Sequence, residues 1–264
     1  MEFKGYKDLV FSRSGKILTV TINRPEVMNA IGPDTEPELI RFFDEVAHDN
    51  ETNVVVITGA GKAFSAGGDI NQMKDMLSKP SAMYPALYTA KKLVFNILDC
   101  PKPIIAKVNG HAIGLGATIA LFCDIVVANE KAKIADPHVS VGYVAGDGGA
   151  VIWPQLIGYA RAKEYLMTGD FITGADAARI GLINYAVPLE GLDAKVDELA
   201  QKLANGAARA ISWTKVSVNI GLKQLAHSIM DASIAYETLS NYTADHAEAV
   251  NAFLEKRKPQ FSGD

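Results

Sequence analysis

The strongest constraint on the fold is a glycine-rich segment between residues 108 and 124. An apolar strand predicted over 104–108 leads into a turn that contains Gly110, Gly114 and Gly116, and an apolar helix is predicted directly after it. Backbone N–H groups in the first turn of a helix have no partner within that helix. Glycines let a ligand atom approach such groups closely. The segment therefore predicts N–H donors that face a developing negative oxygen.

The bulk composition fits one large domain, or a domain with an appended helical part. The chain has 264 residues, of which 48% are hydrophobic, so it can bury a substantial core. A net charge of −4 gives no reason to expect a nucleic-acid partner. No segment approaches the roughly 20 apolar residues of a membrane span. Cys100 and Cys123 lie in apolar segments without metal-ligand spacing, so we expect a reducing, cytoplasmic location.

The order of predicted elements indicates an α/β fold. Apolar strands at 17–22, 53–58, 104–108 and 124–128 alternate with helices, which is typical of a parallel sheet with helices outside it. From residue 192 onward the chain is nearly all helix, with a break at Asn205-Gly206. Helices that extend beyond a core usually pack against a partner, so we expect a homo-oligomer.

A second glycine-rich turn, 59–70, follows the strand at 53–58. The next segment, 71–85, mixes polar residues with methionines and Tyr84, and it is either a lid over an adaptable pocket or an ordinary surface helix. The side chains that favour an apolar or aromatic ligand group are Met76, Met83, Tyr84, Tyr143 and Trp153.

Seven motifs, in order and spacing, resemble those of the crotonase (enoyl-CoA hydratase/isomerase) family. The resemblance covers nearly the whole chain, although each motif alone is weak. The seven motifs are Asn23-Arg24-Pro25-Glu26, Asn29-Ala30, Ala63 to Ile70, Val108 to Asp124, Leu166 to Asp170, Ala175 to Ala178, and Gly181-Leu182-Ile183.

This resemblance implies a spiral core of repeated ββα units that acts on acyl-CoA thioesters. Residues 1–200 would form the core with the active site, and residues 201–264 a helical region for oligomerisation with a CoA-contacting tail. It implies a homotrimer, or a hexamer that is a dimer of trimers. We expect coenzyme A as part of the substrate, no tightly bound cofactor, no membrane partner and no metal site.

By the same resemblance, the thioester oxygen would lie between the N–H groups of Gly68 and Leu115. Losing one such donor typically slows a reaction about 100–1000-fold. Many family members have glycine where this chain has Leu115. The residues implied to contact substrate are Ala66, Asp69, Ile70, Met83, Tyr84, Gly114, Thr118, Tyr143, Trp153, Glu237, Phe253 and Lys256.

The chain departs from the hydratase pattern at the two acid–base positions. Hydratases of this family carry glutamates there, whereas motif alignment puts Thr118 and His138 at these positions. A threonine hydroxyl does not ionise near neutral pH, so we expect Thr118 only to hold a water molecule or to pack. The usual mechanism with two glutamates is therefore unavailable.

A histidine and an aspartate remain as the candidate catalytic pair. His138 can act as a general base near neutral pH, and Asp147, nine residues later, would fix its tautomer. The alternatives are that His138 is a loop residue and that Asp147 caps the following helix. The segment 138–154 also resembles the β-diketone hydrolase branch typified by 6-oxocamphor hydrolase, which cleaves a carbon–carbon bond without CoA. Glu237 is the candidate match for a glutamate in those enzymes, or else an exposed helix residue.

The C-terminal segment 252–259 instead resembles the tail of CoA-using members. There an aromatic residue and a lysine, matching Phe253 and Lys256, reach the CoA of a neighbouring subunit. The two would share a helix face; the alternative is a solvated basic helix end. A third possibility for the whole chain is a non-catalytic homologue that binds acyl-CoA.

Overall fold

The computed structural model describes residues 2–264, and its centre is a six-stranded sheet. The β1–β2 pair is an antiparallel hairpin, and the other neighbouring pairs are parallel. This confirms the parallel sheet that the alternation of elements predicts. In spatial order the strands are β1 (Leu9–Ser14), β2 (Ile17–Ile22), β3 (Val54–Gly59), β5 (Ile104–Val108), β7 (Ile125–Asn129) and β10 (Tyr185–Val187).

A smaller sheet has four short strands in the order β4-β6-β8-β9. The first three are parallel to one another, and β9 is antiparallel to β8. Each of β4, β6 and β8 follows a strand of the large sheet, and a helix comes next, so the chain repeats the ββα unit of the expected spiral. The strands are β4 (Ala63–Ser65), β6 (His111–Ile113), β8 (Lys133–Ala135) and β9 (Ile172–Thr173).

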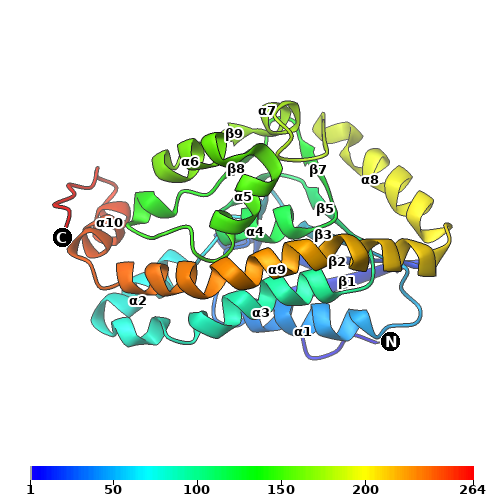
Figure 1. The fold of residues 1–264 in the computed structure, drawn as a ribbon, viewed down its shortest axis with the longest axis horizontal. Helices are drawn as coiled ribbons and strands as arrows, with labels where there is room; N and C mark the ends of the chain where they lie inside the picture. The colour runs from blue at the N-terminus through cyan, green and yellow to red at the C-terminus, as the bar shows by residue number, and fades with distance from the viewer. Residues whose placement is uncertain (1) are drawn as a thin grey trace.

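Three helices lie side by side over the core, with α3 (Ala86–Asp99) between α1 (Thr35–Ala47) and α9 (Ala208–Ser240), as Figure 1 shows. None of the helices in residues 2–264 is long and apolar enough to cross a membrane. The others are α2 (Ile70–Ser78), α4 (Leu115–Phe122), α5 (Gly149–Ile157), α6 (Tyr159–Thr168), α7 (Gly174–Arg179), α8 (Leu189–Ala204) and α10 (Ala244–Glu255), with 3₁₀ helices at Pro25–Val27, Pro80–Met83 and His138–Val141.

The large sheet is buried on both faces, which explains its continuous apolar strands. Every residue of β3 is buried. Val55 and Ile57 face the main core, whereas Val54 and Val56 pack against α8 through Leu192 and its neighbours. The expected boundary between core and C-terminal region, at residue 200, lies within α8. Helix α9 begins four residues after α8 ends. The predicted break at Asn205-Gly206 separates these two helices.

Two aspartates at or next to a helix N-cap pair with other side chains instead of capping the helix. Asp34 stands at the N-cap of α1 but makes no capping hydrogen bond, because its carboxylate pairs with Lys7 at 2.5 Å. The alternative that Asp147 caps α5 is wrong, since the N-cap is Gly148 and the Asp147 carboxylate accepts a hydrogen bond from Thr118.

Asn29 connects its own segment, which begins at Arg24, to the glycine-rich turn at residues 59–70. It is fully buried and has a positive φ of 57°. Its amide donates to the carbonyl oxygens of Ala60 and Ala63, each at 2.8 Å, and its Oδ1 accepts from the Arg24 N–H at 2.9 Å. Asparagine tolerates the left-handed backbone region better than most residues, so the motif residue holds the entrance to β4.

We expect Asn29→Ala to lower the free energy of unfolding by about 3 kcal/mol, because buried backbone groups lose their partners. Urea unfolding followed by circular dichroism measures this. Asn53→Ala is the matched control: its amide makes one part-buried hydrogen bond, to Ala204 O at 3.1 Å, so a loss of about 1 kcal/mol is expected. Equal losses for the two variants would contradict the role given to Asn29.

Candidate active site

The candidate site forms where three parallel strands of the small sheet end. The turn after β4 carries Gly68, the turn after β6 carries Leu115, and the turn after β8 carries His138. In the register of this sheet Ser65 pairs with Ala112, and Ile113 pairs with Ala135. Because carboxyl ends of parallel strands meet at one edge of a sheet, the strand register brings the three turns together.

The two glycine-rich turns touch each other. Gly67 has a φ of +86°, and a Cβ there would lie 2.6 Å from the Ile113 carbonyl oxygen, so a larger residue does not fit. Leu115 is the first residue of α4, whose N-cap is Gly114. Within residues 2–264 the N–H groups of Gly68 and Leu115 have no hydrogen-bond acceptor. Both are therefore available to a ligand oxygen.

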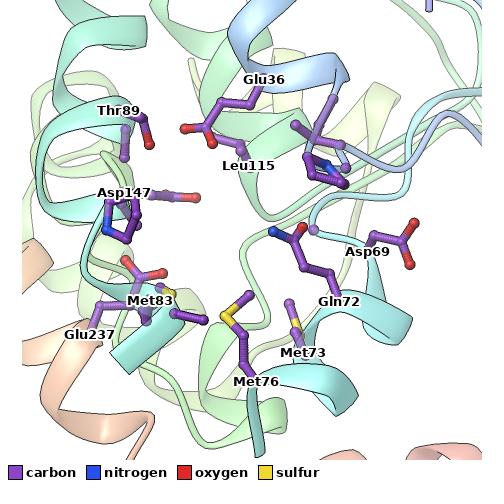
Figure 2. A pocket seen from close by; sticks show the side chains of 18 of the residues that line it. Glu36, Asp69, Gln72, Met73, Met76, Met83, Thr89, Leu115, Asp147 and Glu237 are labelled. Carbon is purple, nitrogen blue, oxygen red and sulfur yellow. The ribbon is translucent and has the colours of Figure 1, made fainter. Parts of the chain in front are cut away.

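These two residues border a cavity of about 310 Å³ together with His138 and Asp147. Figure 2 shows Asp147 and Glu237 entering it from one side and Gln72 from the opposite side, while Asp69 points away. Asp69 instead caps α2 and lies 3.5 Å from the Arg24 guanidinium. The other predicted residues on this cavity are Met76, Met83 and Tyr143.

His138 is buried among three carboxylates. Its Nδ1 is in hydrogen-bond contact with the Asp136 carboxylate, which favours the proton on Nδ1. Its Nε2 lies 3.5 Å from Asp147 Oδ2 and 4.0 Å from Glu237 Oε1. Asp136, and not Asp147 as expected, therefore makes the contact that favours the proton on Nδ1, while Asp147 lies beside Nε2.

Burial and charge shift two pKa values in this cluster. Burial alone lowers the pKa of His138, but the Asp136 and Asp147 carboxylates outweigh it and raise that pKa well above its ordinary value. Burial raises the pKa of Glu237 to about 8, with help from Asp147 and Asp136 and against the effect of His138. Near neutral pH the site therefore contains a buried carboxylic acid beside a histidine.

Other side chains position this cluster. The Thr118 hydroxyl donates to Asp147 Oδ1 at 3.0 Å, so it positions this carboxylate rather than merely packing. The Tyr143 hydroxyl donates to Asn241 Oδ1 at 2.5 Å, and its ring stacks on His246 with centroids 4.0 Å apart. Glu237 is buried on α9 rather than exposed, which excludes the alternative reading of this residue.

A second cavity, of about 350 Å³, adjoins the first and shares Gly68, Met73 and His138 with it. Phe253 and Arg257 line it from the C-terminal segment. The predicted residues found here rather than in the first cavity are Ala66, Ile70, Gly114 and Phe253. The site is thus two connected spaces that meet at His138.

Four predicted contact residues line neither cavity. Thr118 is buried and donates its hydroxyl hydrogen bond to Asp147. Trp153 is fully buried in the core, and Tyr84 is half exposed outside the site, beside Tyr242. Lys256 is exposed and has a left-handed backbone, because α10 ends at Glu255, so it does not continue a helix face with Phe253. Residue type and motif position indicate side chains suited to a pocket, but the tertiary fold decides which of them line it.

Two acidic residues of the site were missed from the sequence. Asp136 lies two residues before His138, and the Asp-x-His spacing directly after a buried strand was the available signal. Glu36, in the first turn of α1, lines the cavity although it is about 100 residues from the other groups. No local pattern connects it with them.

Three residues of the site are of types that can bind a metal ion. Asp136, His138 and Asp147 offer ligand atoms within 4.8 Å of one another. The direct hydrogen bond between Asp136 and His138 Nδ1 leaves no space for an ion between those two atoms. A proton shared by His138 and the carboxylates accounts for this arrangement.

Comparisons with known proteins agree with this geometry. The family model for enoyl-CoA hydratase/isomerase matches residues 12–264. A short-chain-enoyl-CoA hydratase of Clostridium acetobutylicum is 35% identical over 95% of this chain and 96% of its own, and a 1,2-epoxyphenylacetyl-CoA isomerase of Escherichia coli is 32% identical over 94% and 95%. An enoyl-CoA hydratase/isomerase structure from Mycobacterium paratuberculosis superposes with a TM-score of 0.88 at 33% identity, covering 92% of this chain and 97% of that one. With its ββα spiral, the chain belongs to the enoyl-CoA hydratase/isomerase family.

Proposed function

We propose that this enzyme adds water to, or shifts protons within, an acyl-CoA thioester by means of His138 and its carboxylates. The observation that carries the proposal is the position of His138 at the junction of two cavities, beside the unpaired N–H groups of Gly68 and Leu115. A thioester oxygen at these donors gains negative charge as an enolate forms, and preorganised N–H groups stabilise that charge. The alternative that the chain only binds acyl-CoA has no observation in its favour.

For hydration, the site supplies both a base and an acid. The neutral form of His138, which has its proton on Nδ1 and becomes more populated as the pH rises, accepts a proton from water at Nε2. The resulting hydroxide oxygen bonds to the β-carbon, and the π electrons of the double bond move to the thioester oxygen. Glu237, protonated near neutral pH, then gives its proton to the α-carbon. A proton transfer from His138 to Glu237, whose nearest atoms are 4.0 Å apart, restores both groups. Asp147 orients the water, and Asp136 holds the histidine ring.

The second cavity suits the coenzyme A part of the substrate. Phe253 and Phe171 offer aromatic surface there, and Arg257 adds a guanidinium at the rim, although Arg257 also pairs with Glu248 at 2.8 Å. Aromatic surface stacks on a purine base, and a cation attracts phosphate. This arrangement supports CoA binding through Phe253.

A second candidate reaction is the hydrolysis of a carbon–carbon bond in a β-diketone. The observation in its favour is that Glu237 joins His138 and Asp147 in one buried cluster. In that reaction the same activated water attacks a carbonyl carbon. The two candidates differ in whether CoA is part of the substrate.

We further propose a homotrimer or a dimer of trimers. Along α9 the side chains of Trp213, Val216 and Ile220 are exposed at helical spacing, and they are 65%, 41% and 56% accessible. Apolar groups that share one exposed helix face commonly mark a subunit interface.

We expect His138→Gln to lower kcat by about 100–10,000-fold with little change in KM, since a general base acts in the transition state and not in binding. Turnover of a short enoyl-CoA, followed by the loss of thioester-conjugated absorbance, measures this. His48→Gln, on the exposed end of α1, is the matched control. Full turnover by the His138 variant would rule out the general-base role.

The pH profile of kcat/KM tests the Asp136–His138 pair. Neutral histidine is the active form and is populated above its pKa, so the rate rises with pH through that pKa. Because the Asp136 carboxylate raises the pKa of His138, Asp136→Asn lowers it and moves the rising limb to lower pH. Asp75→Asn, exposed on α2, should leave the limb in place. An unmoved limb in Asp136→Asn would mean that another group is the base.

Binding of free CoA, measured by calorimetry, separates the two candidate reactions. We expect Phe253→Ala to weaken CoA binding about 10-fold, because the loss of an aromatic stacking surface is worth roughly 1.4 kcal/mol. Phe261→Ala removes an exposed phenylalanine that lines neither cavity, so it should bind CoA like the parent enzyme. If the parent enzyme does not bind CoA, β-diketone hydrolysis becomes the better account.

A further inference from the structure

The part of the first cavity that lies away from the C-terminal segment is polar. Glu36 comes from α1, Gln72 from α2 and Thr89 from α3, and all three line the same space. Figure 2 shows the Glu36 carboxyl group directed toward Thr89, with the Gln72 amide pointing into the cavity across from Asp147. Three separate helices thus bring hydrogen-bonding groups to a wall that is otherwise made of methionine, proline and alanine side chains.

The ionisable side chains of this wall are almost all acidic. Glu36, Asp147 and Glu237 all contribute carboxyl groups, and none of the described residues that line the cavity is a lysine or an arginine. The Asp69 carboxylate is turned away and paired with Arg24. His138 is the one titratable base among the described lining residues, and its nitrogen atoms lie beside Asp136 and Asp147.

Glu36 has a mixed hydrogen-bonding character. Burial raises its pKa, the negative charge of Asp147 raises it further, and a hydrogen bond with Thr89 acts in the opposite direction. A carboxyl group in this state donates a hydrogen bond when protonated and accepts one when ionised. The Gln72 amide also offers both a donor and an acceptor. A ligand group that both donates and accepts hydrogen bonds can therefore pair with Gln72, and it can pair with Glu36 whether Glu36 is protonated or ionised.

We propose that Glu36 and Gln72 select an acyl group that carries a hydroxyl along its chain, and that they exclude an acyl chain ending in a carboxylate. This inference rests on the proposed use of acyl-CoA and names the class of acyl group. A hydroxyl satisfies Glu36 as donor or acceptor. A plain alkyl end leaves the polar wall without partners, which disfavours binding. A terminal carboxylate would lie near the Asp147 carboxylate and near Glu36, and both Asp147 and the ionised state of Glu36 repel it, so its binding is disfavoured.

The test compares three saturated acyl-CoA thioesters of equal chain length that end in hydroxyl, methyl or carboxylate. Saturated chains cannot undergo addition of water, so calorimetry reports binding alone. For the parent enzyme we expect the hydroxyl compound to bind about 10-fold more tightly than the methyl compound. The carboxylate compound should bind about 100-fold more weakly than the hydroxyl compound.

Two variants assign the selection to Glu36. Glu36→Gln keeps the shape and removes the charge, so it should improve binding of the carboxylate compound about 10-fold and leave the methyl compound unchanged. Glu36→Leu makes the wall apolar and should reverse the preference between hydroxyl and methyl compounds. Glu190→Gln removes one exposed carboxylate in the first turn of α8 and is the charge-matched control, for which no change is expected.

The outcomes separate this inference from the proposed function. If all three compounds bind the parent enzyme equally, or if Glu36→Gln does not favour the carboxylate compound, the role of Glu36 is wrong while the use of acyl-CoA stands. If neither free CoA nor any of the three thioesters binds, the proposed function fails, and the inference fails with it. Unfolding midpoints of the variants, measured by circular dichroism, show that lost binding is not lost folding.

Discussion

The parallel pairing of β4, β6 and β8 is the constraint on which the site depends. Each strand has only three residues, and their register brings the turns after all three to one edge of the small sheet. One turn supplies the Gly68 N–H, the next supplies the Leu115 N–H, and the third supplies His138. Gly67, in the turn after β4, packs closely against the Ile113 carbonyl at the end of β6, so these two turns lie side by side. The strand pairing that forms the small sheet therefore also brings the site residues together.

The chemistry follows from burying one imidazole among several carboxylates. Such a cluster is unfavourable unless its groups share protons and hydrogen bonds. Asp136 and Thr118 meet this requirement, since one binds His138 Nδ1 and the other binds Asp147. The result is an imidazole beside a buried carboxyl group, Glu237, whose pKa is raised to about 8. The function proposed above uses the imidazole as the base and this carboxyl group as the acid.

The two cavities divide the recognition of a substrate between distant parts of the chain. The C-terminal segment, through Phe253, contributes to one cavity, while α1, α2 and α3 contribute polar groups to the other. Because α1 and α3 also contribute to the main core, the shape of the first cavity is coupled to the packing of α3 between α1 and α9. Substrate choice within this fold can therefore change by substitution of a helix side chain without any change at His138.

The sequence by itself determined the parallel sheet and the two glycine-rich turns, because strand patterns and glycine placement are local properties, and the family resemblance pointed to His138 and Asp147. It counted Trp153, Tyr84 and Lys256 among the substrate contacts, although they line neither cavity, since residue type and motif position do not show which side of an element faces a cavity. Only the tertiary structure brought Glu36 and Glu237 to the same cavity and gave Asp136 its contact with His138. The physical reason is that pocket membership depends on how helices far apart in the chain pack against the core, and no local pattern encodes that packing.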